Sequence, residues 1–523
     1  MLNESNEERQ AKSVRDTLLN LPYTEIRERR QVLDDYLFYK GKSEDLEAAK
    51  NNPILYGQNW HVDDNVDYAP TQDIRNKIKP LLKKQARWMF GKEPTLVFKA
   101  DDLKDKEQCE ELRKFIEDVF DDNDMWNNTR KAFLEASIKK RVLLRAEANP
   151  GQPIVIKYES IENFYYKQKN GKLLWVKFFE EDEQNVFKED TEDKTYYLHT
   201  YYYKPIEIKI DENNTRVEYI PCYKKETYVN TEIQKDKTID NEITISKTIP
   251  CWLIKNGGEL NSSFGESDVT DLRDSQNQYN RRNSDFADAL RFQLFGAEAV
   301  IDGKEDDVNR LTIAPNALHA IRTSDEAMAQ NKQATIQRQE YNIGNSSAID
   351  AYLNRCDSDM REMLDMPKIT DLSQIPSAKA MGYLYNDLMA RCDEKFNDWE
   401  KPLLNLIDFI IEVGSFCYPG IFNPYWLSMQ CTKIIKRNVP LPSDEDDKRD
   451  KAMKEVESMV RSHQSYIKEF TNEEDAAKAF EEVLNEQAKI TNSQMDQFNG
   501  RIDDELNNSS EGEEWWMLKR KKN

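Results

Sequence analysis

The chain has 523 residues, of which 38% are hydrophobic and 33% are charged, and its formal net charge is −22. This length is enough for about three or four domains of ordinary size. The acidic balance argues against a protein that reads a nucleic-acid sequence, because such proteins present a basic face. It does not exclude a protein that lets DNA pass without gripping it, because an acidic wall repels phosphate.

Targeting and redox signals are weak. The N-terminal segment MLNESNEERQ is polar and has no apolar run behind it, so we expect no signal peptide. No window approaches the roughly 18 apolar residues of a membrane span, so we expect no membrane partner. Seven scattered cysteines without a CxxC motif predict reduced thiols in a cytosol.

The first third of the chain has helical periodicity. A helix is predicted over 25–39, with Gly41 as its C-cap. A second helix is predicted over 72–90, with a kink at Pro80. Two further amphipathic helices are expected at 109–120 and 125–138.

Between Arg141 and Ile254 the pattern changes to β-branched and aromatic runs separated by polar or Asn/Gly turns. This pattern predicts an antiparallel β region of about six strands. The runs are PIVIKY, KLLWVKFFE, KTYYLHTYYY, IEIKI, RVEYIPCY and TISKTIPCWLI.

The stretch 265–292 predicts one long helix, and Ser263 and Glu266 have the spacing of a capping box before it. Apolar and amide residues alternate three and four apart, which is the spacing of a packing seam. The predicted seam is Val269, Leu272, Gln276, Tyr279, Asn283, Phe286 and Leu290. Its two amides and the charge on the other faces are unusual for a closed core.

The next segment, 293–345, contains short mixed elements, with small strands at AEAVIDG, RLTIAP and ALHAIRT. A helix is predicted over 348–364. The loop MPKITDLSQIP, 366–376, is bracketed by two prolines.

Ser377 is predicted to cap a very long helix that ends at Gly414 and bends at Pro402. Strand character returns at 426–439. Helices are then expected at 446–461 and 473–489, followed by a polar tail.

Sequence signals for catalysis are poor. Gly41-Lys42-Ser43 ends like a phosphate loop, but position 36 is Tyr where that loop needs glycine. The four histidines (61, 199, 319 and 463) lack ligand spacing. Four acidic pairs could suggest two-metal chemistry, although a chain this acidic produces such pairs by chance. These pairs are Asp63-Asp64, Asp101-Asp102, Asp121-Asp122 and Asp306-Asp307.

Two helices that flank a small αβ insert therefore remain as the main architectural signal. This signal alone leaves open a helical hairpin with an inserted subdomain in a protein of any function.

An ordered series of motifs resembles the portal proteins of tailed bacteriophages, of the SPP1 type. The resemblance extends over about 25–490 and lies in the order of the motifs rather than in one signature. Where the family often has Ser-Gly-x-Ala before the long helix, this chain has Ser377-Ala378-Lys379-Ala380. The motifs are ERRQVLDDYLFYKGK, DIRNKIKPLLKKQARWMFGKEPTLVF, TIPCWLIKN, the GESD entrance with the helix that bears Asp271, Tyr279, Asn280 and Ser284, and MVRSHQSYIKEFTNEEDAAKAFEEVLNEQ.

The resemblance implies an α+β portal fold that forms a ring oligomer, and it assigns each segment a place. The implied parts are a wing of N-terminal helices and β region (1–264), a first stem helix (265–292), a clip (293–345), a second stem helix (346–365), a tunnel loop (366–376), a long kinked wing helix with a return strand (377–441), a crown (442–490) and a weakly ordered tail (491–523).

The resemblance also implies the function. The chain would form a twelve-membered ring at one capsid vertex of the virion, assembled in the host cytoplasm, through which double-stranded DNA is packaged and ejected. Implied partners are other copies of the chain, DNA without sequence specificity, the terminase motor that hydrolyses ATP, the major capsid protein, a scaffolding protein and the head–tail adaptor. We expect no cofactor, no bound metal and no enzymatic activity.

Contacts to passing phosphates should be weak and interchangeable, because they carry no sequence code. An ordinary solvated or subunit-bridging charge is an equal alternative at each candidate position. The candidates for exposure to DNA are Arg281, Arg282, Lys368, Asp371, Ser373, Gln374 and Lys379. Rival functions are another head–tail connector protein and a metal-dependent nuclease that uses some of the acidic pairs.

Overall fold

The computed structural model describes residues 14–41, 71, 73–169, 171–189, 192–211, 214–258, 260, 262–295, 297–308, 321–339, 346–368, 378–440, 445–470 and 477–489. The chain divides into two compact units. The first comprises Met1–Gln374 and Met381–Pro440, and the second comprises Ile375–Ala380 and Leu441–Asn523.

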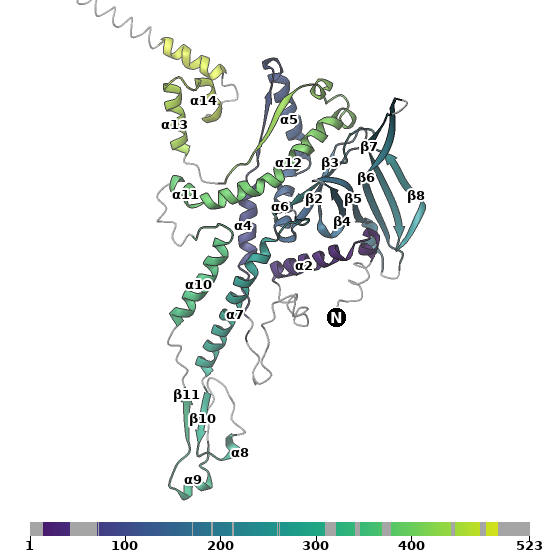
Figure 1. The fold of residues 1–523 in the computed structure, drawn as a ribbon. Coiled ribbons are helices and arrows are strands. Elements are labelled where there is room, and N and C mark those ends of the chain that lie inside the picture. The colour runs from purple at the N-terminus through teal and green to yellow at the C-terminus, as the bar shows by residue number, and fades with distance from the viewer. Residues whose placement is uncertain are drawn as a thin grey trace, which may run out of the picture. The chain divides into compact units, whose positions relative to one another are not determined.

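The first unit contains helices at both ends of a continuous run of strands from β2 to β9 (Figure 1). Its helices are α2 (Tyr23–Lys40), α4 (Ile78–Phe90), α5 (Lys106–Asp122), α6 (Met125–Lys139), α7 (Asp268–Phe295), α8 (Glu305–Val308), α9 (Asp325–Ala329), α10 (Ser346–Glu362) and α12 (Asn386–Cys417). Its strands are β1 (Thr95–Ala100), β2 (Arg141–Glu147), β3 (Val155–Ser160), β4 (Phe164–Lys169), β5 (Lys172–Glu181), β6 (Thr195–Asp211), β7 (Asn214–Val229), β8 (Glu232–Glu242), β9 (Cys251–Lys255), β10 (Ala297–Ile301), β11 (Thr335–Gln339) and β12 (Cys431–Lys436).

The strands form antiparallel sheets in the orders β4-β5-β6-β7-β8, β3-β2-β9, β1-β12 and β10-β11. The predicted antiparallel β region is confirmed, but it holds eight strands rather than six. KTYYLHTYYY and IEIKI form one strand, β6. Three strands, β2, β4 and β8, match none of the predicted runs. Strand β8 is mostly exposed and polar, whereas β4 is partly buried and β2 is almost entirely buried.

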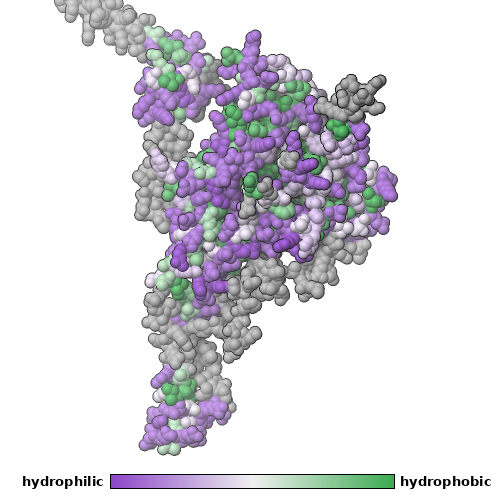
Figure 2. All heavy atoms as spheres, viewed as in Figure 1, coloured by the Kyte–Doolittle hydropathy of each residue, from purple (hydrophilic) through white to green (hydrophobic). Residues whose placement is uncertain are grey.

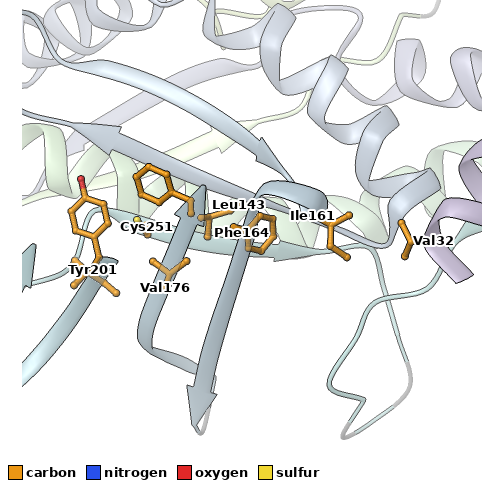
Figure 3. Packing of buried hydrophobic residues seen from close by; sticks show 9 residues of the cluster. Val32, Leu143, Ile161, Phe164, Val176, Tyr201 and Cys251 are labelled. Atoms are coloured by element: carbon orange, nitrogen blue, oxygen red, sulfur yellow. The ribbon is translucent and has the colours of Figure 1, made fainter. Parts of the chain in front are cut away.

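A hydrophobic cluster joins the two larger sheets to helix α2. Leu143 from β2 and Cys251 from β9 meet Val176 from β5, and Val32 contributes from α2 (Figure 3). Phe164 and Ile161 are fully buried in the same cluster. The surface seen in Figure 2 is largely hydrophilic, with scattered hydrophobic residues.

Helix α2 ends where the sequence predicted, because Gly41 adopts the left-handed backbone (φ 55°) and donates its N–H to Leu37. The predicted helix over 72–90 is wrong in its first turn and a half. Helix α4 begins only at Ile78, so Pro80 lies in its first turn and needs no kink.

Two other helix starts also differ from the predictions. The capping box at Ser263 and Glu266 is wrong, because α7 begins at Asp268 and the Ser267 hydroxyl accepts the N–H of Val269 at 3.2 Å. The long helix predicted to continue to Gly414 is interrupted at Tyr385, which separates α11 (Ala378–Leu384) from α12. The Tyr385 ring stacks on Trp88 with centroids 4.4 Å apart.

The second unit contributes α13 (Glu445–Glu457), α14 (His463–Phe470) and a helical stretch over 477–489. His463 stacks on Phe480 with centroids 5.4 Å apart, which joins α14 to that stretch. The predicted strand RLTIAP, the cap residue Ser377 and the tail 491–523 lie outside the described residues.

Candidate functional site

Helix α7 has a polar line of buried side chains where most helices have an apolar stripe. After Val269 and Leu272, the buried positions are Gln276, Asn280, Ser284 and Asp288. These four residues are each one helical turn apart, and we call them the polar ladder.

The polar ladder binds the backbone of a segment far away in sequence, Thr71 with residues 73–77, which we call the strap. Four backbone N–H groups at alternate strap positions donate to the four ladder side chains. The pairs are Lys77 to Gln276 (2.8 Å), Arg75 to Asn280 (3.1 Å), Asp73 to Ser284 (2.9 Å) and Thr71 to the two carboxylate oxygens of Asp288 (3.1 and 3.0 Å).

The two spacings agree for a geometric reason. Two residues of extended chain advance about 6.6 Å, and four residues of an α-helix advance about 6.0 Å. An extended segment beside a helix can therefore offer an N–H to every fourth helical residue. This pairing keeps residues 73–77 out of α4 and explains why the helix predicted over 72–90 begins late.

Several ladder groups make a second hydrogen bond. The Gln276 amide donates to the Arg75 carbonyl at 2.9 Å and to Asn280 Oδ1 at 2.9 Å. Asn283, beside the ladder, donates to the Asp73 carbonyl at 3.2 Å. Gln276 thus holds the strap by a donor and an acceptor together, as a neighbouring strand would.

The start of α7 is anchored by a buried carboxylate. Both oxygens of Asp268 accept from the Lys395 ammonium at 2.8 Å, and Arg391 lies 3.4 Å away. Both cations come from α12. A carboxylate at the first residue of a helix also interacts favourably with the helix dipole. Asp268 therefore fixes the position of α7 relative to α12.

A second anchor joins α7 to α2. The buried Asp35 carboxylate accepts from Arg273 at 2.7 Å and from the Thr270 hydroxyl at 3.0 Å. The first part of α7 is thus held on two sides by ion pairs, and the later part is held by the strap.

The predicted packing seam coincides with the buried line only as far as Gln276. Beyond it, Tyr279, Asn283 and Phe286 are half-buried, and Leu290 is 41% exposed. The strap covers the face of α7 that bears the polar ladder. These four side chains therefore lie on a neighbouring face of the helix. Helix α10 packs along α7, and Lys77 lies over the Tyr279 ring and 3.8 Å from Asp357 of α10.

The predicted DNA-facing residues divide into three groups. Arg281 is half-buried and Arg282 is exposed, with an ion pair to Asp285 at 2.9 Å. Lys368 is exposed and donates to the Asn354 carbonyl at 3.3 Å and the Ser358 hydroxyl at 3.2 Å. Asp371, Ser373, Gln374 and the side chain of Lys379 lie outside what the structure describes.

A cavity of about 580 Å³ lies in the β region, lined by His199, Glu180, Tyr223 and Phe178 among others. His199 Nε2 lies 3.0 Å from Glu180, and its Nδ1 lies 2.7 Å from the Tyr223 hydroxyl. The hydrogen bond from His199 lowers the pKa of Glu180 to about 2. These groups lie against one another, and we interpret them as a structural network.

The acidic pairs do not assemble a metal site in the part of the chain that the structure describes. No group of three or more His, Cys, Asp or Glu there could hold a metal ion. Asp102 accepts the N–H of Lys104 at a helix start, and Asp307 pairs with Arg322. Asp63-Asp64 lies outside the described residues. Within these same ranges, we find no helix with the length and apolarity that a bilayer crossing requires.

The sequence analysis named Asn280 and Ser284 only as part of the family motif, did not name Asp288, and placed none of the three in the buried line. The signal that could have found them is the exact four-residue spacing of polar side chains from Gln276 onward. Such spacing indicates one helix face, but the sequence does not name the segment that lies against it.

No curated protein matches the chain. Among solved structures, the neck of a native gene transfer agent (GTA) particle computed with C12 symmetry is 8% identical, with a TM-score of 0.40 over 77% of this chain and 95% of that chain. The virion of a native GTA particle is also 8% identical, with a TM-score of 0.39 over 76% and 94%. The family described as "Phage portal protein, SPP1 Gp6-like" matches residues 20–493. Because that match covers most of the chain, the protein belongs to the family of SPP1 Gp6-like phage portal proteins.

Proposed function

We propose that this portal protein forms a twelve-membered ring at one capsid vertex, and that the ring is the channel for double-stranded DNA during packaging and ejection. The observation that carries the proposal is the family match over residues 20–493. The ring would dock the terminase motor during packaging and the head–tail adaptor afterwards. The major capsid protein and a scaffolding protein would be its partners during assembly in the host cytoplasm.

Helices α7 and α10 would be the stem of this channel, with residues 293–345 as the clip. The polar ladder supports this assignment because its hydrogen bonds to the strap hold one face of α7 in place without an apolar core. The remaining faces of α7 bear charge, including exposed Asp271, Asp274, Arg282 and Asp285. Side chains of this kind suit a helix that borders water.

The seam residues outside the ladder suit contacts between subunits. Tyr279 and Phe286 are half-buried in the single chain, and Leu290 is exposed. In a ring, each stem helix has a neighbour on either side, so an apolar flank can be buried there. The half-buried Asn283 would keep part of this contact polar.

The channel wall would carry few basic groups. Duplex DNA presents one phosphate charge per roughly 1.7 Å of axis, so a wall with many cations would hold the strand. A chain with net charge −22 offers a largely repulsive wall. We assign the weak contacts to Arg281 and Arg282 in the stem and to Lys368, Asp371, Ser373, Gln374 and Lys379 in or beside the tunnel loop 366–376.

The remaining segments follow the same assignment. Residues 1–264 and 377–441 would form the wing, and 442–490 the crown. ATP hydrolysis would come from the terminase.

Negative-stain electron microscopy of the purified full chain tests the proposal. We expect top views of a ring with a central hole and twelve-fold symmetry. Particles that are only monomers or dimers without a hole would contradict it. A parallel assay of plasmid cleavage with Mg²⁺ or Mn²⁺ tests the nuclease alternative, and robust cutting that a chelator abolishes would favour that alternative.

A further inference from the structure

Three side chains from distant parts of the chain meet where α7 begins beside α12. Asn256 follows β9, Asp268 is the first residue of α7, and Lys395 lies on α12. The Lys395 Nζ donates to Asn256 Oδ1 at 2.8 Å and to both carboxylate oxygens of Asp268 at 2.8 Å. The Asn256 Nδ2 donates to Asp268 Oδ1 at 3.3 Å. One carboxylate oxygen therefore contacts both the amine nitrogen and the amide nitrogen.

This group of side chains is shielded from water. Asn256 and Asp268 are 4% and 6% exposed, and the Lys395 side chain is 12% exposed. The fully buried Phe133 ring lies beneath the Lys395 ammonium, with its centroid 6.0 Å away. The exclusion of water favours a reaction between protein groups over hydrolysis of the amide.

The backbone around Asn256 holds its side chain close to the amine. The Asn256 N–H donates to the Lys140 carbonyl at 2.8 Å, and its carbonyl accepts from the Glu266 N–H at 2.9 Å. Because a C=O bond is about 1.2 Å long, the Lys395 Nζ lies no more than about 4 Å from the Asn256 Cγ. Reacting atoms are aligned at about 3–3.5 Å, so the amine needs to move by at most about 1 Å.

We propose that Lys395 and Asn256 form an intramolecular isopeptide bond, and that Asp268 transfers the protons. The Lys395 Nζ gives a proton to the Asp268 carboxylate and attacks the Asn256 Cγ. The bond between Cγ and Nδ2 then breaks. Two protons pass in turn from Nζ through Asp268 to the leaving nitrogen, which departs as an ammonium ion, and Asp268 returns to a carboxylate. One amide replaces another, so the step consumes no oxidant and no other reactant.

The bond would leave the buried carboxylate paired. It removes the charge of Lys395, but the Arg391 guanidinium lies 3.4 Å from Asp268 and remains as the counter-charge. The bond would close a loop between residues 139 positions apart, which restricts the unfolded chain. Under the proposed function, on which this step alone rests, it would tie the segment that enters the stem covalently to the long wing helix.

Mass spectrometry of the purified full chain tests the bond directly. After overnight incubation of the folded protein, we expect an intact mass lower by one ammonia. Protease digestion should release a branched peptide that joins Asn256 to Lys395. Because the crosslink closes a long loop, the denatured chain should also migrate faster in a denaturing gel than an unlinked variant.

Variants assign the roles of the two charged residues. Lys395→Arg keeps a cation beside Asp268 but has no amine, so it should retain the full mass. Asp268→Asn should form the bond at least about 100-fold more slowly, because the proton acceptor is missing. The matched control Lys401→Arg changes an exposed lysine on the same helix and should form the bond like the wild type. Circular dichroism checks that each variant is folded.

Three results would overturn the proposal. The first is a wild-type chain of unchanged mass. The second is loss of ammonia with linear peptides only, which a succinimide at Asn256-Gly257 would give. The third is loss of water with a branch at Asp268. Equal rates in Asp268→Asn and the wild type would remove Asp268 from the mechanism. None of these readouts depends on ring formation or DNA, so the portal proposal can fail independently.

Discussion

Among the ladder residues, Asn280 should contribute the most to stability relative to the size of its side chain. Its Oδ1 accepts from the Arg75 N–H and from the Gln276 amide, and the side chain is 7% exposed. Asn280→Ala removes the acceptor of the Arg75 N–H and of one of the two Gln276 amide bonds, which should lower the free energy of unfolding by about 1–3 kcal/mol. Urea denaturation of the variant and the wild type measures this difference.

The control for this prediction keeps the acceptor. Asn280→Asp retains a carbonyl-type oxygen toward Arg75 and should lose much less stability than the alanine variant. Equal losses in the two variants would show that the hydrogen bonds to the strap are not the cause.

Glu180 should give the protein a distinct sensitivity to acid. The hydrogen bond from His199 depresses its pKa from 4.5 to about 2, so the ionised form is favoured in the folded state. This stabilisation is fully present above pH 4.5 and is lost as the pH falls toward 2. Glu180→Gln should therefore be less stable than the wild type at pH 7, with a gap that narrows between pH 4.5 and 2.

Melting temperatures of the two proteins across that range measure the gap. Because many other carboxylates titrate in the same range, only the difference between the two proteins is informative. A difference that does not change from pH 7 down to pH 2 would contradict this account of the Glu180–His199 pair.

The turn before α7 depends on a glycine at close approach. A Cβ at Gly265 would lie 2.3 Å from the Lys140 carbonyl oxygen and 2.9 Å from the Asn256 nitrogen, both backbone atoms. Gly265→Ala should therefore cost on the order of 3 kcal/mol, the upper end for overpacking. It should also displace the start of α7 from Asn256 and its anchor on α12.

Gly171 provides the comparison, because a Cβ there meets no atom within 4 Å although its φ is +74°. Gly171→Ala should cost only about 1–2 kcal/mol, the strain of a left-handed backbone. Chemical denaturation of both variants should rank Gly265→Ala as clearly the more destabilised, and the reverse order would contradict the steric argument.

The exposed flank of α7 should matter for assembly rather than for folding. Leu290 is 41% exposed in the single chain, so Leu290→Asp should leave the melting temperature of the monomer nearly unchanged. If that flank is buried between subunits, the buried charge should raise the protein concentration that ring formation requires at least tenfold. Light scattering after size-exclusion chromatography measures the oligomer.

Leu174→Asp is the matched control, because Leu174 is 37% exposed but lies on β5. It should assemble normally. Rings of equal stability in both variants would remove Leu290 from the proposed interface.

The sequence predicted the end of an element correctly where that end depends on a few adjacent residues. Gly41 ended α2 as predicted, because a left-handed cap is a property of a few adjacent residues. The start of α4 and the break at Tyr385 could not be predicted in the same way. The first depends on hydrogen bonds that backbone N–H groups of residues 73–77 donate to α7 side chains, and the second lies where Tyr385 stacks on Trp88.

For the candidate site, the sequence indicated a polar seam on one long helix but not its partner. The predicted seam followed Tyr279, Phe286 and Leu290 because they are the large residues. The buried line instead follows Asn280 and Ser284, since small polar side chains let the strap backbone approach. Contacts between segments some 200 positions apart leave no local pattern, so only the folded chain reveals them.

At the scale of the whole molecule, the proposed channel predicts how DNA should respond to a change of charge. The Arg282 side chain is 53% exposed, and among the described residues it pairs only with the exposed Asp285 on the same helix. Such a pair contributes little to stability, so Arg282→Glu should change the free energy of unfolding by less than about 1 kcal/mol. In a twelve-membered ring, however, the substitution would be repeated twelve times around the DNA.

We therefore expect Arg282→Glu rings to bind duplex DNA more weakly and with less dependence on salt. The slope of log K against log salt should fall by about 0.9 for each phosphate contact that is lost. Lys172→Glu makes the same change of charge at an exposed position in the β4–β5 turn and should bind DNA like the wild type. Fluorescence anisotropy with a labelled duplex, measured across a salt series, compares the three proteins. If the two variants behave alike while both form rings, Arg282 does not face the DNA, and the stem assignment of that side of α7 must be abandoned.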